Sequence, residues 1–254
     1  MSSPSFSLEG QVALVTGAGR GLGRAISLGL AQAGADLVIT SRTVGELQSL
    51  AAEVRAKGRR CRCFTADLSR VREIEPLVEA AWSAFGGIDV LVNNAGVSIV
   101  EPAAEVSEEH WDLVLDLNLK GLFFVAQAVG RRMLERGSGK IVNMASQAGV
   151  VGLANHAAYC ASKGGVVLLT KVLALEWASR GITVNAVAPT VIRTPMSDRA
   201  FADPEARADV LRRIPLGRIG EPSDVVGAVV FLASPAADLI TGTTLLVDGG
   251  WTAQ

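Results

Sequence analysis

The only tyrosine of this 254-residue chain stands four residues before a lysine, as Tyr159 and Lys163. Side chains four residues apart share one face of a helix, so the two would lie side by side. A phenol exchanges a proton readily near its pKa of ~10, and a neighbouring ammonium lowers that pKa. The pair therefore predicts an acid/base couple that gives a proton to a carbonyl oxygen or takes one from an alcohol. By itself, such a pair would more often belong to an exposed helix surface.

Two further polar residues are candidates for the same chemistry. Ser146 follows the apolar run Lys140–Ala145, and its hydroxyl could donate a hydrogen bond to the negative charge that develops on that oxygen. Asn118 stands in a long apolar helical region, where an asparagine is most often a buried polar group with satisfied hydrogen bonds. With Ser146 upstream, Tyr159 and Lys163 are predicted to be catalytic.

Gln147 and His156 flank these candidates and predict contacts with a substrate. Both side chains can hydrogen-bond the hydroxyl groups of a small sugar-like ketone. His156 also stands where a helix is expected to begin, so a structural role is an equal alternative for it.

A glycine-rich turn, Thr16 to Gly23, follows the first expected strand. Its glycines, among them Gly17 and Gly21, permit a tight turn and let the backbone approach a pyrophosphate. The helix that begins near Gly21 points its free N–H groups and the positive end of its dipole at that phosphate. Because the turn lies between a strand and a helix, it predicts a dinucleotide site rather than an ordinary turn.

The end of the second expected strand predicts which dinucleotide is bound. In NAD-binding sites an acidic residue usually stands there and accepts hydrogen bonds from the ribose hydroxyls. Here the strand ends in Thr40-Ser41-Arg42, without an acid, and an arginine suits a 2′-phosphate. Arg20, inside the glycine-rich turn, could supply a second cation. The sequence thus favours NADP(H), with NAD(H) as the alternative if Arg42 is an ordinary solvated arginine.

These candidates need a scaffold that brings distant turns together. Short apolar runs alternate with helical stretches, which predicts parallel strands joined by right-handed crossovers. The expected fold is α/β: a single-domain Rossmann fold over residues 1–254, with a doubly wound seven-stranded parallel sheet and helices on both faces. The expected strands are Val12–Thr16, Leu37–Thr40, Cys61–Thr65, Ile88–Val92, Lys140–Ala145, Ile182–Val187 and Thr244–Val247. The expected helices are Leu22–Ala33, Glu46–Ala56, Glu73–Phe85, Glu108–Arg136, Tyr159–Ser179 and Ser223–Leu232.

Residues 190–220 depart from this regular alternation. The stretch is polar and contains Pro195, Pro204 and Pro215. We expect it to form a mobile flap over the substrate rather than a linker between domains.

Composition argues against several other classes of protein. Charged residues make up 19% and the formal net charge is -1, so the basic face of a nucleic-acid binder is not expected. No uninterrupted apolar run approaches the ~18 residues of a membrane helix, and the first seven residues lack a signal-peptide pattern. Three cysteines and two histidines argue for reduced thiols and against a metal site. We expect a cytoplasmic protein that binds neither nucleic acid nor membrane.

Together the motifs resemble those of the short-chain dehydrogenases/reductases, in their classical branch. The resemblance extends over essentially the whole chain, and it implies hydride transfer between a nicotinamide and a carbonyl/alcohol pair, usually by a tetramer with two-fold symmetry. Pro189-Thr190 departs from the family's usual Pro-Gly, but is similar to the carbonyl and xylulose reductase subgroup, as are Ser146-Gln147 and Asn155-His156. The motifs that carry the resemblance are Thr16-Gly17-x-x-x-Gly21-x-Gly23, Asn93-Asn94-Ala95-Gly96, Asn118, Ser146 and Tyr159-x-x-x-Lys163.

The resemblance also implies roles for single residues. Asn118 would anchor a water that leads to Lys163 in a proton relay. Asp67 would contact the adenine, and Ile192 and Thr194 would hold the nicotinamide carboxamide. The full set implied for the cofactor is Gly17, Arg20, Gly21, Leu22, Gly23, Ser41, Arg42, Asp67, Leu68, Asn94, Ala95, Gly96, Tyr159, Lys163, Ile192 and Thr194.

Three functions remain open from the sequence. The first is an NADP(H)-dependent reductase of small hydroxylated ketones, dicarbonyls or ketoses, which also oxidises polyols. The second is a 3-oxoacyl-(acyl-carrier-protein) reductase, for which Arg131, Arg132 and Arg136 could offer a basic docking patch. The third is a non-enzymatic cofactor sensor or scaffold on the same fold, which would be expected to lose catalytic residues that this chain retains.

Overall fold

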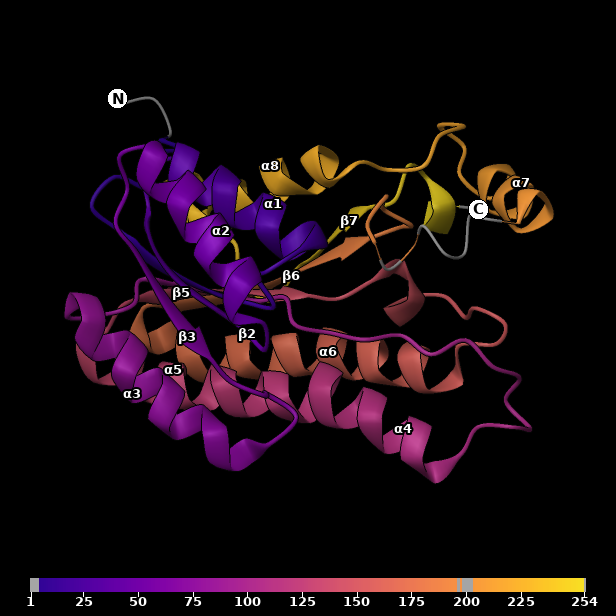
Figure 1. The fold of residues 1–254 in the computed structure, drawn as a ribbon, viewed down its shortest axis with the longest axis horizontal. Helices are drawn as coiled ribbons and strands as arrows, with labels where there is room; N and C mark the ends of the chain where they lie inside the picture. The colour runs from indigo at the N-terminus through magenta and orange to yellow at the C-terminus, as the bar shows by residue number, and fades with distance from the viewer. Residues whose placement is uncertain (1–4, 196, 198–202, 254) are drawn as a thin grey trace.

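The computed structural model describes residues 5–195, 197 and 203–253. In this part of the chain, seven strands form one parallel sheet in the order β3-β2-β1-β4-β5-β6-β7. Helices cover both faces, which confirms the predicted α/β class with a seven-stranded parallel sheet (Figure 1). The strands are β1 (Val12–Thr16), β2 (Asp36–Ser41), β3 (Cys61–Thr65), β4 (Val90–Asn93), β5 (Gly139–Met144), β6 (Ile182–Pro189) and β7 (Thr244–Val247).

The strand order reverses between β1 and β4, and this reversal positions the site. The two strands are neighbours, yet the chain between them first builds β2 and β3 on the far side of β1. Where the order reverses, the connections leave toward opposite faces of the sheet and open a crevice at the carboxyl ends of the strands. The turns that follow β1, β4 and β5 therefore meet at one edge of the sheet.

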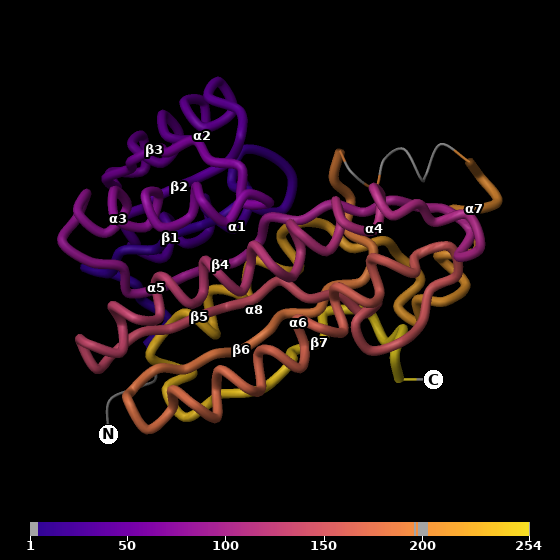
Figure 2. Tube along the Cα trace, turned by 90° about the horizontal axis from the view of Figure 1, so that it is seen from below, coloured from indigo at the N-terminus to yellow at the C-terminus, as the bar shows by residue number. Residues whose placement is uncertain are grey.

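The helices form one layer on each face. The helices α1, α2 and α8 lie on one side of the sheet, and α3, α4, α5 and α6 lie on the other (Figures 1 and 2). Fully buried Ile26 and Leu30 of α1 share a core with Val225 and Val229 of α8. The helices are α1 (Gly21–Gln32), α2 (Val44–Ala56), α3 (Ile74–Phe85), α4 (Glu108–Leu115), α5 (Leu122–Arg136), α6 (Ala157–Trp177), α7 (Pro204–Arg212) and α8 (Pro222–Ala233).

The long helix predicted for residues 108–136 is interrupted by a π-helical stretch, Asp116–Gly121, between α4 and α5. Such stretches are rare and are frequently found at functional sites. Gly121 lies so close to the chain after β3 that a Cβ there would be 2.2 Å from the carbonyl oxygen of Leu68. Asn118 lies inside this stretch and is fully buried.

Residues 190–220, for which the sequence predicted a mobile flap over the substrate, contain the helix α7. The carboxylate of Asp203 accepts a hydrogen bond from the backbone N–H of Glu205 (2.9 Å), and Pro204 stands in the first turn of α7. An acidic cap followed by proline is an ordinary signal for the start of a helix. Residues 196 and 198–202 of the expected flap lie outside the described residues.

By length and composition alone, two helical stretches of the described chain could cross a membrane. They span Glu108–Arg136 and Ala157–Arg180, and in the most apolar window of the first, half of the residues are buried inside the protein. Both stretches pack against the sheet, as core helices of the same composition do. They are therefore weak evidence for a membrane.

Candidate active site

Close backbone contacts build the glycine-rich turn between β1 and α1. Gly17 has a φ of +62°, and a Cβ at this position would lie 2.8 Å from the Cα of Ala95. A Cβ at Gly23 would lie 2.3 Å from the carbonyl oxygen of Gly17. A side chain at either position would force the turn away from its neighbours, so both positions require glycine.

The turn after β4 is tied directly to the glycine-rich turn. The Thr16 hydroxyl accepts hydrogen bonds from the backbone N–H groups of Asn94 (2.9 Å) and Ala95 (3.1 Å). The side-chain amide of Asn94 donates to the carbonyl oxygens of Thr16 (3.0 Å) and Gly17 (3.2 Å). Asn94 and Ala95, which were expected on the adenosine side, therefore lie beside the glycine-rich turn. Gly96 was expected there too, but a Cβ at Gly96 would lie 3.2 Å from the Oδ1 of Asn118 and 3.7 Å from the Nζ of Lys163.

The amino-terminal end of α1 is open to an anion. No side chain caps it, and its first turn contains no acidic residue. At the start of α8, by contrast, the carboxylate of Asp224 accepts a hydrogen bond from the N–H of Glu221 (2.7 Å). Uncapped N–H groups and the positive end of the helix dipole suit a pyrophosphate. Gly21 and Leu22 open α1, and a Cβ at Gly21 would lie 3.5 Å from the Cβ of Thr194.

Two arginines border the expected adenosine end of the site. The side chains of Arg20 and Arg42 are exposed, and within the described part of the chain neither makes a hydrogen bond or an ion pair. Ser41, the last residue of β2, is half-buried, and its hydroxyl accepts a hydrogen bond from the N–H of Thr43 (3.3 Å). Two exposed guanidinium groups without such partners can bind a 2′-phosphate, because a phosphate forms charge-assisted hydrogen bonds with arginine.

Asp67 follows β3 and interacts electrostatically with Arg42. Its carboxylate accepts hydrogen bonds from the hydroxyl (2.7 Å) and the N–H (3.2 Å) of Ser69. Burial tends to raise the pKa of Asp67, but these hydrogen bonds and the charges of Arg42 and Arg70 together hold that pKa below its ordinary value. Asp67 is therefore an anionic acceptor at the expected adenine contact, with the buried Leu68 next to it.

Asn118 joins the chain after β4 to α6. Its Oδ1 accepts a hydrogen bond from the N–H of Val97 (2.8 Å), and its Nδ2 donates to the carbonyl oxygen of Val97 (2.8 Å) and to the hydroxyl of Ser162 (3.1 Å). Ser162 donates in turn to the carbonyl oxygen of Tyr159 (2.7 Å). These contacts make Asn118 a satisfied buried group; the water relay toward Lys163 stays a prediction.

Ser146, Tyr159 and Lys163 meet where β5 ends beside α6. The Nζ of Lys163 donates to the carbonyl oxygen of Met144 (2.7 Å), the last residue of β5, and lies 5.7 Å from the centre of the Tyr159 ring. Lys163 is 4% exposed and Ser146 is 7% exposed. The hydroxyl of Ser146 lies close enough to the phenol of Tyr159 to lower the pKa of that phenol. The structure thus brings together the three residues that the sequence predicted for one oxygen atom.

Burial controls the protonation of this group. It raises the pKa of Tyr159 above its ordinary value, and the nearby hydroxyl of Ser146 offsets only part of the rise. Burial also lowers the pKa of Lys163 to about 8. The sequence-based expectation that the pKa of Tyr159 falls below its ordinary value was therefore wrong, because burial of the phenol is the largest effect on that pKa and raises it. At neutral pH Tyr159 carries its proton and Lys163 is mostly charged.

The two expected substrate contacts lie close to the catalytic candidates. Gln147 is 2% exposed, and its Oε1 accepts a hydrogen bond from the Ser146 hydroxyl at 3.4 Å. His156 is half-buried, with its ring centre 6.3 Å from that of Tyr159 and its Nδ1 2.7 Å from the carbonyl oxygen of Ala154. Contact of either side chain with a substrate stays a prediction.

A support for His156 was missed in the sequence. Glu101, in the loop after β4, forms an isolated β-bridge with His156, and its carboxylate lies 2.9 Å from the Nδ1 of His110 in α4. Asn155, next to His156, has a φ of +62°, the only positive φ of a non-glycine residue in the described chain. The loop after β4 is thus fastened to the loop that enters α6. Separate glutamate and histidine residues give no sequence signal for this pairing.

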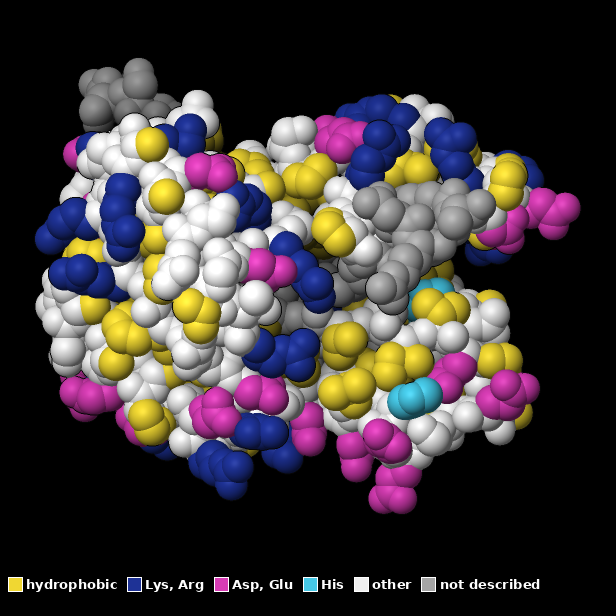
Figure 3. Space-filling model, viewed as in Figure 1, with side chains coloured by type: hydrophobic (Ala, Val, Ile, Leu, Met, Phe, Trp, Pro, Cys, Tyr) yellow, Lys and Arg dark blue, Asp and Glu magenta, His cyan; other side chains and the backbone are white. Residues whose placement is uncertain are grey.

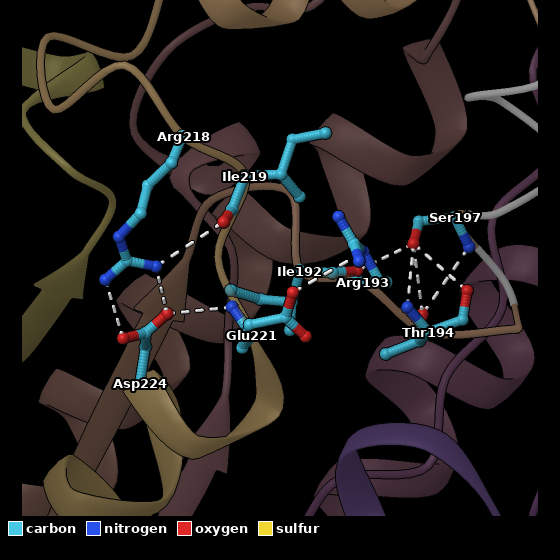
Figure 4. Close-up of polar contacts among 8 residues, drawn as sticks. All are labelled: Ile192, Arg193, Thr194, Ser197, Arg218, Ile219, Glu221 and Asp224. Carbon is cyan, nitrogen blue, oxygen red and sulfur yellow. Dashed lines mark hydrogen bonds and ion pairs between the residues drawn. The ribbon is translucent and has the colours of Figure 1, made fainter.

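Ile192 and Thr194, the residues expected beside the nicotinamide, lie in a segment with several polar contacts (Figure 4). Ile192 forms a β-bridge with Gly220, and the N–H of Arg193 donates to the carbonyl oxygen of Gly220 (2.8 Å). The Ser197 hydroxyl donates to the carbonyl oxygen of Ile192 (2.7 Å) and accepts a hydrogen bond from the N–H of Thr194 (2.9 Å). The backbone after β6 is therefore fixed by Gly220 through backbone contacts and by Ser197 through its hydroxyl.

An ion pair at the start of α8 supports the Gly220 side of this segment, and the sequence did not predict it. Both terminal nitrogens of Arg218 contact the carboxylate of Asp224, at 2.6 and 2.8 Å (Figure 4). The hydrogen bond with Arg218 is the main reason that the pKa of Asp224 is lowered to about 2. The sequence signal that was available is Glu221-Pro222, which is typical of the start of a helix.

In the space-filling view the surface is hollowed between the part that contains α7 and the part that contains α4 (Figure 3). This hollow lies on the side of the molecule toward which β6 points (Figure 1). The crevice expected from the strand order opens on the same side.

Comparison with known proteins gives consistent matches over nearly the whole chain. Residues 17–252 match the family described as Enoyl-(Acyl carrier protein) reductase. The chain is 46% identical to the D-threitol dehydrogenase of Mycolicibacterium smegmatis, over 97% of this chain and 95% of that protein. It is 44% identical to the L-xylulose reductase of Mesocricetus auratus, over 96% of this chain and 97% of that protein. The solved structure of a gluconate 5-dehydrogenase from Burkholderia cenocepacia J2315, in complex with NADP and tartrate, matches with a TM-score of 0.95 and 37% identity, covering 99% of this chain and 98% of that one.

Proposed function

This chain belongs to the short-chain dehydrogenase/reductase family, and on that basis we propose that it is an NADP(H)-dependent oxidoreductase that interconverts a ketone and a secondary alcohol on a small sugar or polyol. The observation that carries the proposal is the convergence of Ser146, Tyr159 and Lys163 at the end of β5. The similar proteins named above for threitol, xylulose and gluconate support the substrate class, since all three compounds are small and polyhydroxylated.

Tyr159 is the proton donor in the reductive direction. Its phenol is protonated at neutral pH because burial raises its pKa, so it can protonate a carbonyl oxygen as negative charge develops there. Ser146 donates a second hydrogen bond to that oxygen. The charge of Lys163 stabilises the phenolate that remains, and in our assignment a water anchored by Asn118 leads to Lys163 and returns a proton to the phenolate. A bound nicotinamide supplies the hydride in reduction and accepts it in oxidation.

The cofactor would lie across the carboxyl ends of β1 and β4. The glycine-rich turn and the open end of α1 hold the pyrophosphate, while Asp67 contacts the adenine. Arg20 and Arg42 hold the 2′-phosphate of NADP(H). Ile192 and Thr194 hold the nicotinamide end. NADP bound to the similar gluconate 5-dehydrogenase supports this choice of dinucleotide.

Gln147 and His156 select the substrate by hydrogen bonds to its hydroxyl groups. The alternative substrate, a 3-oxoacyl thioester on a carrier protein, is less well supported because two of the three arginines of the expected basic patch are paired with acids. Arg132 pairs with Glu79, and Arg136 pairs with Asp89 at 3.0 Å.

We further propose a cytoplasmic homotetramer. Leu168, Val172 and Leu175 lie on one face of α6 by their spacing, and they are 64%, 47% and 84% exposed. Exposed apolar faces of this kind commonly mark subunit contacts. The free thiols of Cys61, Cys63 and Cys160 are consistent with a reducing compartment.

The experiment that tests the proposed function measures consumption of NADPH and NADH by the purified protein with a panel of carbonyl substrates. The panel contains ketoses, keto-sugar acids, α-dicarbonyls without hydroxyl groups, and 3-oxoacyl thioesters. Turnover of the ketoses or keto-sugar acids, with NADPH preferred, is the expected result. Turnover of the thioesters alone would contradict the proposed substrate class.

A further inference from the structure

The carboxylate of Glu46 reaches the glycine-rich turn from α2. Glu46 stands in the first turn of that helix and is half-buried. A Cβ at Gly19 would lie 2.5 Å from the Oε2 of Glu46 and 3.0 Å from the hydroxyl of Ser41. The carboxylate, the Ser41 hydroxyl and the turn therefore converge on one point. Across the described residues, this carboxylate has no hydrogen-bond or ion-pair partner.

That point borders the place where the ribose of the adenosine would bind, since the end of the second strand contacts this ribose in dinucleotide-binding folds. Four charged residues stand on the segments that border this region. Arg20 follows Gly19 and Arg42 follows Ser41, both with positive charge, while Asp67, which interacts with Arg42, and Glu46 are negative. Asp67 is already engaged by Ser69. Glu46 is the acid whose oxygens are free to accept hydrogen bonds.

A carboxylate at this position treats the two dinucleotides differently. It accepts a hydrogen bond from the 2′-hydroxyl of NAD(H), which is the role of the acid that usually ends the second strand. It repels the 2′-phosphate of NADP(H), because like charges at short range raise the free energy of the complex. The effect of Glu46 on cofactor choice therefore opposes that of Arg42.

We propose that Glu46 is a specificity-determining residue that moderates the preference for NADP(H) and lets the protein also bind NAD(H). It supplies from α2 the carboxylate that the end of β2 lacks. This inference rests on the proposed function, because only a dinucleotide site gives Glu46 a ribose to contact. A purely structural role would be different: an acid in the first turn of α2 stabilises the helix dipole and would leave the cofactor ratio alone.

The test measures the affinity of two fragments that differ only in the 2′-phosphate, adenosine 2′,5′-bisphosphate and adenosine 5′-monophosphate, by isothermal titration calorimetry. In Glu46→Gln we expect the ratio of the two affinities to move about fivefold to tenfold toward the bisphosphate at low ionic strength, and to move less at high salt, where exposed charges are screened. The matched control is Glu53→Gln, which removes the same charge from the same helix at a position paired with Arg24. Its ratio should stay at the wild-type value.

The outcomes separate this inference from the function on which it rests. If neither fragment binds the wild-type protein, the dinucleotide site itself is wrong, and both proposals fail. If both fragments bind and Glu46→Gln leaves their ratio unchanged, only the role of Glu46 is overturned. An equal shift in Glu53→Gln would also overturn it, because the effect would then come from general surface charge.

Discussion

The two ends of the proposed cofactor site are built in opposite ways. At the catalytic end, Asn118, Ser146 and Lys163 are buried, and backbone groups or neighbouring side chains hold each of them. At the adenosine end, Arg20 and Arg42 are exposed and, in the part of the chain that the structure describes, make no hydrogen bond or ion pair. A buried polar group depends on exact partners, whereas an exposed charge acts through water and is screened by salt. Under the proposed function, we therefore expect geometry to govern catalysis and charge to govern the choice of cofactor.

At the catalytic end, we expect the removal of a single oxygen atom to have the largest effect on turnover. In Tyr159→Phe only the hydroxyl is removed, and we expect turnover to fall about 10³-fold because no other described side chain at the site is placed to donate the proton. Binding of NADPH, measured by fluorescence titration, should stay within about twofold of wild type since the ring remains. Turnover close to the wild-type rate would show that the buried end does not depend on this phenol.

The charge of Lys163 should give the site its dependence on pH. Burial lowers its pKa to about 8, so the ammonium is present below that pH and is lost above it. We expect kcat/KM for reduction to decline above about pH 8, because a neutral amine no longer stabilises the phenolate. In Lys163→Met, kcat/KM should be about 10²-fold lower at neutral pH. The alkaline decline should be absent from that variant, and an identical decline in both proteins would assign it to another group.

At the adenosine end the same kind of substitution should change preference rather than rate. We expect Arg42→Asp to move the ratio of kcat/KM for NADPH over NADH about tenfold or more toward NADH, with the larger change at low salt. Arg62→Asp is the control, since Arg62 is also exposed but pairs in register with Val38, away from the carboxyl end of β2. A loss of activity with both cofactors would mean that Arg42 acts as a structural residue, like those of the buried end.

Local spacing made part of the fold and site predictable from the sequence. The alternation of apolar runs and helices gave all seven strands to within two residues at each end, because buried parallel strands are apolar throughout. Tyr159 and Lys163 could be paired because both lie on one helix, α6. Their spacing does not indicate how deeply they are buried, however. Burial raises the pKa of Tyr159, whereas the sequence predicted a lowered pKa.

What could not be predicted depends on contacts between distant segments. The π-helical stretch around Asn118 packs against Leu68, and Glu46 reaches the glycine-rich turn from the next helix. The anchor of Ile192 on Gly220 joins residues on either side of α7. None of these contacts leaves a periodic pattern, since each needs the folded chain to bring its partners together. By contrast, α7 itself was predictable from Asp203-Pro204.

The segment that contains Ile192 and Thr194 combines features of the buried catalytic end and of the exposed adenosine end of the site. The variant Arg218→Met tests which of the two ends it resembles. Arg218 is exposed, yet its bond to Asp224 supports Gly220, which pairs with Ile192. Exposed ion pairs contribute little, so we expect the Kd for NADPH to rise only about threefold to fivefold. Binding of adenosine 2′,5′-bisphosphate should not change, because this fragment lacks the nicotinamide end.

The effect of Arg218→Met should also be constant from about pH 4 upward, since the pKa of Asp224 is lowered to about 2 and the ion pair persists throughout. Arg212→Met is the matched control, because Arg212 makes a similar exposed ion pair with Asp209 on α7, at 3.1 Å. Weaker binding of NADPH and of the fragment alike would indicate a general loss of stability. If Arg218→Met leaves the affinities for NADPH and for the fragment unchanged, the backbone hydrogen bonds between residues 191–193 and 220 are sufficient to fix the segment that contains Ile192 and Thr194. The nicotinamide end would then resemble the buried, geometrically fixed part of the site.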